Sequence, residues 1–240
     1  MTVRRGDDAS HGTSAAARRA SARAERVDNA FRAFVGDPRF PCLAAKGAVR
    51  RRGYRLGVYS AFGSADAAAA LARVLTAFVR TPAADGAGLT AFVAVFPGRA
   101  PASEREFERR LWAQLQHLHE CDDPTVGWDP RVSADPEDPS FAFSFAGQAF
   151  YVVGLHPRSS RLARRFRWCA LVFNPHAQFE RLRAEGRFAR LRALIRARDT
   201  VLQGSSNPSL ADFGERSEAR QYSGRATEAE WRCPFHPRSP

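Results

Sequence analysis

The chain has 240 residues, a mass of 26.5 kDa and a formal net charge of +12, and 44% of its residues are hydrophobic. This length suits one domain with a sizeable core, and because no apolar run approaches the roughly 20 residues of a membrane helix, we expect no membrane-spanning segment. The charge alone suggests a nucleic-acid-binding module. However, 36 of the 37 basic residues are arginines spread along the chain, often beside glutamate, so we expect a solvated basic surface and no nucleic-acid partner.

The N-terminal region differs in composition from the rest. Residues 1–27 are rich in Ala, Ser and Arg and poor in apolar side chains, which predicts a disordered tail ahead of one domain over residues 28–240. No apolar stretch follows Arg4-Arg5, which argues against twin-arginine export. The four cysteines show no CxxC spacing, so neither a zinc site nor a disulfide framework is indicated. We therefore expect a cytoplasmic protein with reduced thiols.

The first half of the domain shows helix and strand patterns in turn. Asp28 and Ser64 are suitable N-caps, and Asp37-Pro38 ends the first helix. The continuous apolar run at residues 89–96 is typical of a buried central strand. The expected elements, in order, are a helix over 28–35, a strand over 54–60, a helix over 64–80, and the strand over 89–96.

The second half continues in the same way. Ser103 and Glu106 form a capping box that opens a helix ending near residue 120. Ala146-Gly147 separates two apolar stretches and predicts a hairpin. The expected elements are strands over 141–145, 148–155 and 168–173, helices over 176–184 and 188–202, and a Ser/Gly/Pro-rich end over 204–240. The mixture predicts an α+β (mixed α/β) domain with one mixed sheet flanked by helices.

The first candidate site is the turn over residues 37–46, which carries Cys42 and Lys46. Lys46 is the one lysine of an arginine-rich chain, which is consistent with a need for a compact ammonium group. A cysteine at such a turn can serve as a thiolate ligand of iron. The plainer alternative for Cys42 is a small buried side chain.

Two histidines follow expected strands. His156 comes after the strand that ends at Leu155 and is fixed by Pro157, and His176 comes after Phe173-Asn174-Pro175 at the start of a helix. Ligand sites favour such strand ends. Taken singly, either histidine could also be an ordinary hydrogen-bonded side chain.

Charged side chains cluster at two further places. Four arginines follow His156 closely, and residues 161 and 165 are one helical turn apart, so they could hold carboxylates in bidentate contacts. Glu215 and Glu218 are at helical spacing and could bind a guanidinium or ammonium group. An exposed cationic helix and a capped surface turn are the respective alternatives. The four arginines are Arg158, Arg161, Arg164 and Arg165.

Several of these stretches, in this order, resemble the YqcI/YcgG family. The similarity covers about residues 28–236 and is closest to the branch that contains the heme-dependent pre-guanitoxin N-hydroxylase. The matching phrases are Phe40-Pro41-Cys42, Phe145 through Pro157, Ser160-Arg161, Ala163 through Phe166, Phe173 through His176, Gln178-Phe179-Glu180, and Tyr222 toward Trp231 through Phe235.

The resemblance implies a b-type heme that activates O2 as co-substrate and N-hydroxylates an arginine-like guanidino or amino metabolite. Under it, we favour His156 as the metal ligand and the four arginines as the propionate partners, with Cys42 also in the cofactor site. His176 and Lys46 are the expected catalytic side chains, and Glu215 and Glu218 the expected substrate carboxylates. No nicotinamide motif is visible, so a separate electron-donor protein is expected.

Three choices stay open at this point. The axial ligand could be His156, His176 or Cys42. The protein could instead be a non-catalytic heme-binding or heme-sensing protein. It could also form a homodimer, which the sequence does not specify.

Overall fold

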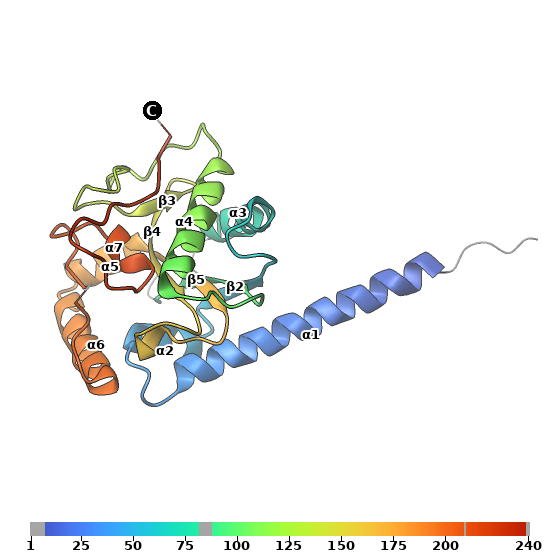
Figure 1. Ribbon diagram of the computed structural model, residues 1–240, viewed down its shortest axis with the longest axis horizontal. Helices are drawn as coiled ribbons and strands as arrows, with labels where there is room; N and C mark the ends of the chain where they lie inside the picture. Colours follow the sequence, from blue (N-terminus) through green and yellow to red (C-terminus); the bar gives the residue numbers. More distant parts are fainter. Residues whose placement is uncertain (1–7, 82–87, 209, 239–240) are drawn as a thin grey trace, which may run out of the picture.

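The computed structural model describes residues 8–81, 88–208 and 210–238, and its centre is a five-stranded mixed sheet in the order β1-β2-β5-β4-β3. β1 and β2 are parallel, and the other neighbours are antiparallel. The predicted mixed sheet flanked by helices is confirmed (Figure 1). The strands are β1 (Tyr54–Val58), β2 (Ala91–Phe96), β3 (Phe143–Phe145), β4 (Gln148–Leu155) and β5 (Cys169–Pro175).

The hairpin between β3 and β4 turns where the sequence predicts it. Ala146 and Gly147 have φ of 51° and 74°, and Phe145 pairs with Gln148. Two successive positive φ values match the twist of antiparallel strands, as in the turns that favour two-residue hairpins. The turn therefore fixes the register that places Tyr151, Val153 and Leu155 on one face of β4.

One face of the sheet is covered by α3 (Ala65–Val79), α4 (Glu104–Glu120), the short α7 (Ala219–Tyr222) and the C-terminal segment. The predicted caps are present: Ser64 accepts a hydrogen bond from the Ala67 amide, and Ser103 accepts one from the Glu106 amide. Leu111, Leu115 and Phe173 are completely buried in this layer. We call it the packed face.

The other face lies under α1 (Asp8–Gly36), α2 (Leu43–Arg50), α5 (His176–Ala184) and α6 (Phe188–Gln203). No residue of α6 is buried, although its 16 residues lie across this side of the molecule. The sequence did not indicate α2, because residues 37–46 read as a turn; the Cys42 sulfur caps this helix by accepting from the Ala45 amide at 3.4 Å. We call this side the hollow face.

The N-terminal segment differs from its prediction. Residues 1–7 lie outside the described residues, but from Asp8 the chain is helical and continuous with the short helix expected from Asp28. Residues 16–26 are exposed, and Figure 1 shows α1 running away from the body. Ala and Arg are strong helix formers, so a stretch without apolar side chains can extend a helix that is anchored elsewhere. The anchor is Val27, Phe31 and Val35, which are buried.

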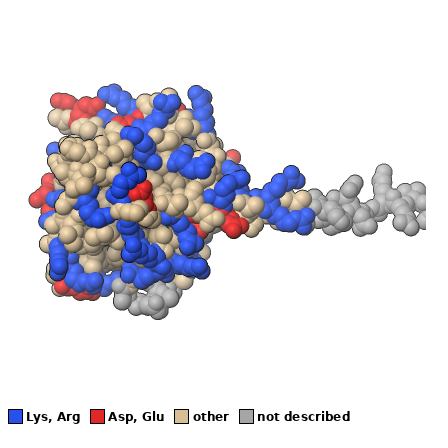
Figure 2. Space-filling view, turned by 90° about the horizontal axis from the view of Figure 1, so that it is seen from below, with Lys and Arg blue, Asp and Glu red and all other residues tan. Residues whose placement is uncertain are grey.

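The surface agrees with the charge pattern of the sequence. Figure 2 shows basic side chains spread over the visible face and along α1, with uncharged surface between them. In the described part of the chain, no helix combines the length and the apolar character needed to cross a membrane.

Candidate functional site

A cavity of about 350 Å³ separates the hollow face of the sheet from the helices that cover it. Its walls come from α1, α2, α5, α6 and the segment over 207–221. Most of the lining is apolar, including Phe31, Phe40, Val93, Leu155 and Val172. A cavity of this size with few polar groups is typical of a small-molecule or cofactor site.

Strand alternation decides which polar groups enter the cavity. Side chains of one strand alternate between faces, so Val172 and Asn174 share the hollow face with the position two residues further on, His176. On β4, Tyr151 and Leu155 take the hollow face by the same rule. The side chain of His176 therefore faces the cavity at the point where β5 ends and α5 begins.

His176 and Glu218 form a buried pair in the cavity wall. The Nε2 atom of His176 lies 3.2 Å from Oε1 of Glu218, and both residues are almost inaccessible to solvent. Burial raises the pKa of the Glu218 carboxyl, and the hydrogen bond and charge of His176 oppose this shift. Nδ1 of His176 and Oε2 of Glu218 have no hydrogen-bond partner in the described part of the protein, although Nδ1 lies 3.8 Å from Oε1 of Glu180. Two buried polar atoms without a hydrogen bond in an apolar cavity point to a ligand.

Two of the four predicted arginines, Arg161 and Arg164, line the cavity. Arg161 pairs with Asp199 of α6 and donates to the Ser205 carbonyl at 3.3 Å. Arg164 donates to the Tyr222 carbonyl at 2.9 Å and has no carboxylate partner among the described residues; burial lowers the pKa of its guanidinium. Gly224 makes room for it, since a Cβ there would lie 2.4 Å from Arg164 Cδ.

The other two arginines lie outside the cavity. Arg158 and Arg165 are exposed, and Arg165 donates to the Ser159 carbonyl at 2.9 Å. The prediction paired residues 161 and 165 on one helical turn, but the chain forms only a 3-10 turn over Leu162–Arg164, in which residues 161 and 164 face the cavity. The cavity thus receives two of the four guanidinium groups.

His156 also lies outside the cavity lining. It follows Leu155, which faces the cavity, so alternation turns His156 to the packed face, where its ring stacks on Phe107 with centroids 4.1 Å apart. Both ring nitrogens lack a hydrogen-bond partner among the described residues, and burial lowers the pKa of His156 to about 4. The structure therefore separates the two histidines that the sequence placed at equivalent strand ends.

Cys42 caps the short helix α2 and Lys46 lies within it, and the two side chains take different roles. Cys42 lines the cavity, and burial raises the pKa of its thiol against the hydrogen bonds from the Ala45 and Ala44 amides. Lys46 is not part of the lining; its ammonium group donates to the Asp37 carbonyl at 2.6 Å and to the Pro38 carbonyl at 3.3 Å. Lys46 thus holds the turn before α2.

The two predicted substrate carboxylates are also separated. Glu218 is buried in the cavity wall, whereas Glu215 is exposed and accepts a hydrogen bond from the Asp212 amide at 2.9 Å. Two further side chains of the lining were not predicted from the sequence: Tyr151, whose hydroxyl donates to Gln221 at 3.1 Å, and Asp199, which pairs with Arg161. Alternation along β4 could have indicated Tyr151.

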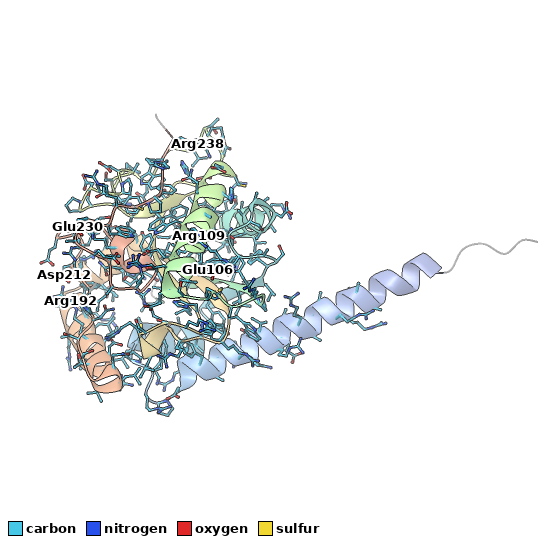
Figure 3. The ribbon with its side chains drawn as sticks, in the orientation of Figure 1. Glu106, Arg109, Arg192, Asp212, Glu230 and Arg238 are labelled. Carbon is cyan, nitrogen blue, oxygen red and sulfur yellow. The ribbon has the colours of Figure 1, made fainter. Side chains whose placement is uncertain are left out.

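Ion pairs at the cavity edge join α6 to the neighbouring segment. Asp212 pairs with Arg192 and with Arg196, the latter at 2.9 Å, and Figure 3 shows Arg192 and Asp212 side by side near α6. On the opposite edge, Arg198 donates to the carbonyls of Pro38 and Phe40. These polar contacts hold both edges of α6 in place, so that the helix covers the cavity; we call α6 the roof of the cavity.

Comparisons with known proteins identify the family of the chain. The family model for the YqcI/YcgG family matches residues 31–236. The "Uncharacterized protein YcgG" of Bacillus subtilis (strain 168) is 29% identical over 135 residues, which are 54% of this chain. The match spans 53% of that relative, about half of its length. No solved structure matches the chain.

Proposed function

This chain belongs to the YqcI/YcgG family, and from that membership and the cavity we propose that it is a heme-dependent oxygenase that N-hydroxylates a guanidino- or amino-bearing small metabolite with O2. One observation carries the proposal. Within an apolar cavity, a buried histidine and a buried carboxylate each present a polar atom that has no hydrogen bond among the described residues, Nδ1 of His176 and Oε2 of Glu218. One suits a metal ligand and the other a cation.

The residues of the cavity fit a heme. The lining is mostly apolar, as a porphyrin requires, and heme iron needs only one protein ligand. His176 and Cys42 are the histidine and the cysteine of the described lining, and we propose His176 as the iron ligand, with Cys42 as the alternative. Arg161 and Arg164 would pair with the two propionates. Heme, when bound there, would supply the activation of O2.

The remaining side chains would bind the substrate and keep water out. Glu218 would hold the cationic group of the substrate, since its free oxygen lies in the cavity wall beside His176. α6 would roof the site and exclude water from the reaction. A separate electron-donor protein would supply the electrons.

Hemin titration of the purified protein tests the cofactor and its ligand. We expect a stable Soret band after desalting and a ferrous–CO spectrum typical of histidine ligation, which is lost in His176→Ala. Cys42→Ala and His156→Ala should keep that spectrum. A thiolate-type spectrum that is lost only in Cys42→Ala would identify Cys42 as the iron ligand. A histidine-type spectrum that is lost only in His156→Ala would identify His156. No Soret band would remove the proposal.

Glu218→Gln and Glu215→Gln form a matched pair for the substrate. With heme-loaded protein, we expect an arginine-like ligand to bind much more weakly to Glu218→Gln and unchanged to Glu215→Gln. Because burial raises the pKa of Glu218, binding should also weaken as the pH falls and the carboxylate is protonated. Heme binding without N-hydroxylation, given O2 and reductant, would favour the non-catalytic heme protein.

A further inference from the structure

A second hollow lies on the packed face, on the other side of the sheet from the cavity. It has a volume of about 320 Å³, and its walls include the rings of Trp112 from α4 and Trp231 from the C-terminal segment. Three arginines and one carboxylate also line it: Arg105, which pairs with Glu228, Arg109, Arg232, and Glu108, which pairs with Arg225. Figure 3 shows Arg109 on α4. Aromatic rings with a cationic border suit a small anionic molecule.

Aromatic rings connect this hollow with the cavity through the interior. The ring centroids of Trp231 and Trp112 are 6.3 Å apart, and those of Trp112 and Tyr222 are 5.7 Å apart. Tyr222 of α7 lies 6.0 Å from Tyr151, which lines the cavity. Trp112 and Tyr222 are buried, so the series runs from the surface to the cavity through the protein core.

We propose that Tyr151, Tyr222, Trp112 and Trp231 form a relay that carries oxidising equivalents out of the cavity to an anionic one-electron reductant in the second hollow. The proposal rests on the proposed function, because it requires a redox group in the cavity. Tyrosine and tryptophan lose one electron much more readily than phenylalanine, which forms most of the surrounding aromatic core. The relay protects the protein when an oxidant forms without substrate.

The electrons balance with hydrogen peroxide as oxidant and, as the anionic reductant, a thiol that also carries a carboxylate. In each passage, one electron moves from Trp231 through Trp112, Tyr222 and Tyr151 to the oxidised group, and one thiol then restores Trp231. Two passages reduce one peroxide to two waters and join two thiols in one disulfide, and the thiols supply both protons.

The hydrogen bonds of the two tyrosines in the series support this transfer. The hydroxyl of Tyr151 donates to Gln221, and that of Tyr222 donates to the Phe150 carbonyl at 3.2 Å, so each phenol proton can stay in its hydrogen bond and return with the electron. The indole nitrogen of Trp112 has no partner among the described residues. The guanidinium of Arg220 lies 5.3 Å from the centre of the Trp231 ring. Its charge disfavours a positive charge on the oxidised ring, and an anion bound in the second hollow would offset this repulsion.

Peroxide treatment of hemin-loaded protein without substrate tests the relay. We expect an organic radical in freeze-quenched electron paramagnetic resonance spectra, and oxygen addition at Trp231 in peptide mass spectra. Trp112→Phe, which loses no hydrogen bond, should lower the oxidation of Trp231 severalfold. Trp168→Phe, outside the series, should not change it. Ascorbate, an anionic reductant, should suppress the modification.

The outcomes separate this inference from the proposed function. Protein that forms no Soret band with hemin overturns both. A normal Soret band, with equal oxidation of Trp231 in wild type, Trp112→Phe and hemin-free protein, overturns the relay alone. If Trp112→Phe does not fold by circular dichroism, Tyr151→Phe at the inner end serves instead and should give the same severalfold decrease.

Discussion

On the packed face of the sheet, Leu111, Leu115 and Leu171 are completely buried, whereas on the hollow face the whole of α6 lacks a buried residue. The same strands build both faces, because β4 and β5 send alternate side chains to each. The packed face holds the apolar core, and the hollow face holds the atoms of His176 and Glu218 that have no hydrogen bond among the described residues. Stability and the proposed chemistry are thus assigned to opposite sides of one sheet, as expected when a site is built on a rigid scaffold.

Leu171→Ala and Leu155→Ala would test this comparison most strongly. The two leucines belong to neighbouring strands, but Leu171 lies in the packed core and Leu155 lines the cavity. Leu171→Ala should lower the free energy of unfolding by about 4 kcal/mol, because it creates a cavity in a filled region. Leu155→Ala should cost about half as much, since its neighbourhood is already hollow. Denaturant unfolding measures both, and equal losses would show that the two faces are packed alike.

His156 offers a second test, because it belongs to the packed face. Burial lowers its pKa from 6.5 to about 4 in the folded protein. A lowered folded-state pKa gives stability that is complete above pH 6.5 and is lost as the pH falls to about 4, by up to about 3 kcal/mol. Unfolding measured across this pH range should show a smaller acid loss in His156→Phe than in wild type.

The sequence could predict the sheet but not the assignment of its two faces. The caps at Ser64 and Ser103, the hairpin at Ala146-Gly147 and the strands were visible as local patterns. His156 and His176 looked equivalent because both follow apolar strands, and both faces of those strands are apolar. Whether the odd-numbered or the even-numbered side chains of a strand face the cavity depends on how helices that are distant in the sequence pack on the sheet. The buried Glu218 and the exposed Glu215 differ for the same reason.

The ion pairs of α6 provide a third, smaller test. Asp199 pairs with the buried Arg161, whereas Asp212 pairs with the more exposed Arg192 and Arg196. Asp199→Asn should lower the free energy of unfolding by about 2 kcal/mol, because it leaves a buried guanidinium without its carboxylate. Asp212→Asn should cost under about 1 kcal/mol. Hemin affinity measured in the same variants should fall more for Asp199→Asn; equal effects would mean that α6 is held by its apolar contacts.

Lys46→Arg should have the smallest effect and would refine the description of the hollow face. Lys46 joins the carbonyls of Asp37 and Pro38, and Arg198 of α6 also donates to the Pro38 carbonyl at 2.8 Å. Lys46 therefore fixes the turn that one edge of α6 contacts through Arg198. A planar guanidinium cannot replace a compact ammonium between two carbonyls, so we expect a loss of about 1 kcal/mol.

Lys46→Arg also separates a structural role from a catalytic one. Lys46 lies outside the cavity lining, so hemin affinity and turnover of the folded variant should stay close to those of wild type. Thermal unfolding, hemin titration and turnover are measured on the same preparation. A large fall in turnover with unchanged stability would return Lys46 to the catalytic role that its survival in an arginine-rich sequence suggested. The roof would then transmit the position of this turn to the substrate, because Arg198 and Asp199 are neighbours on α6.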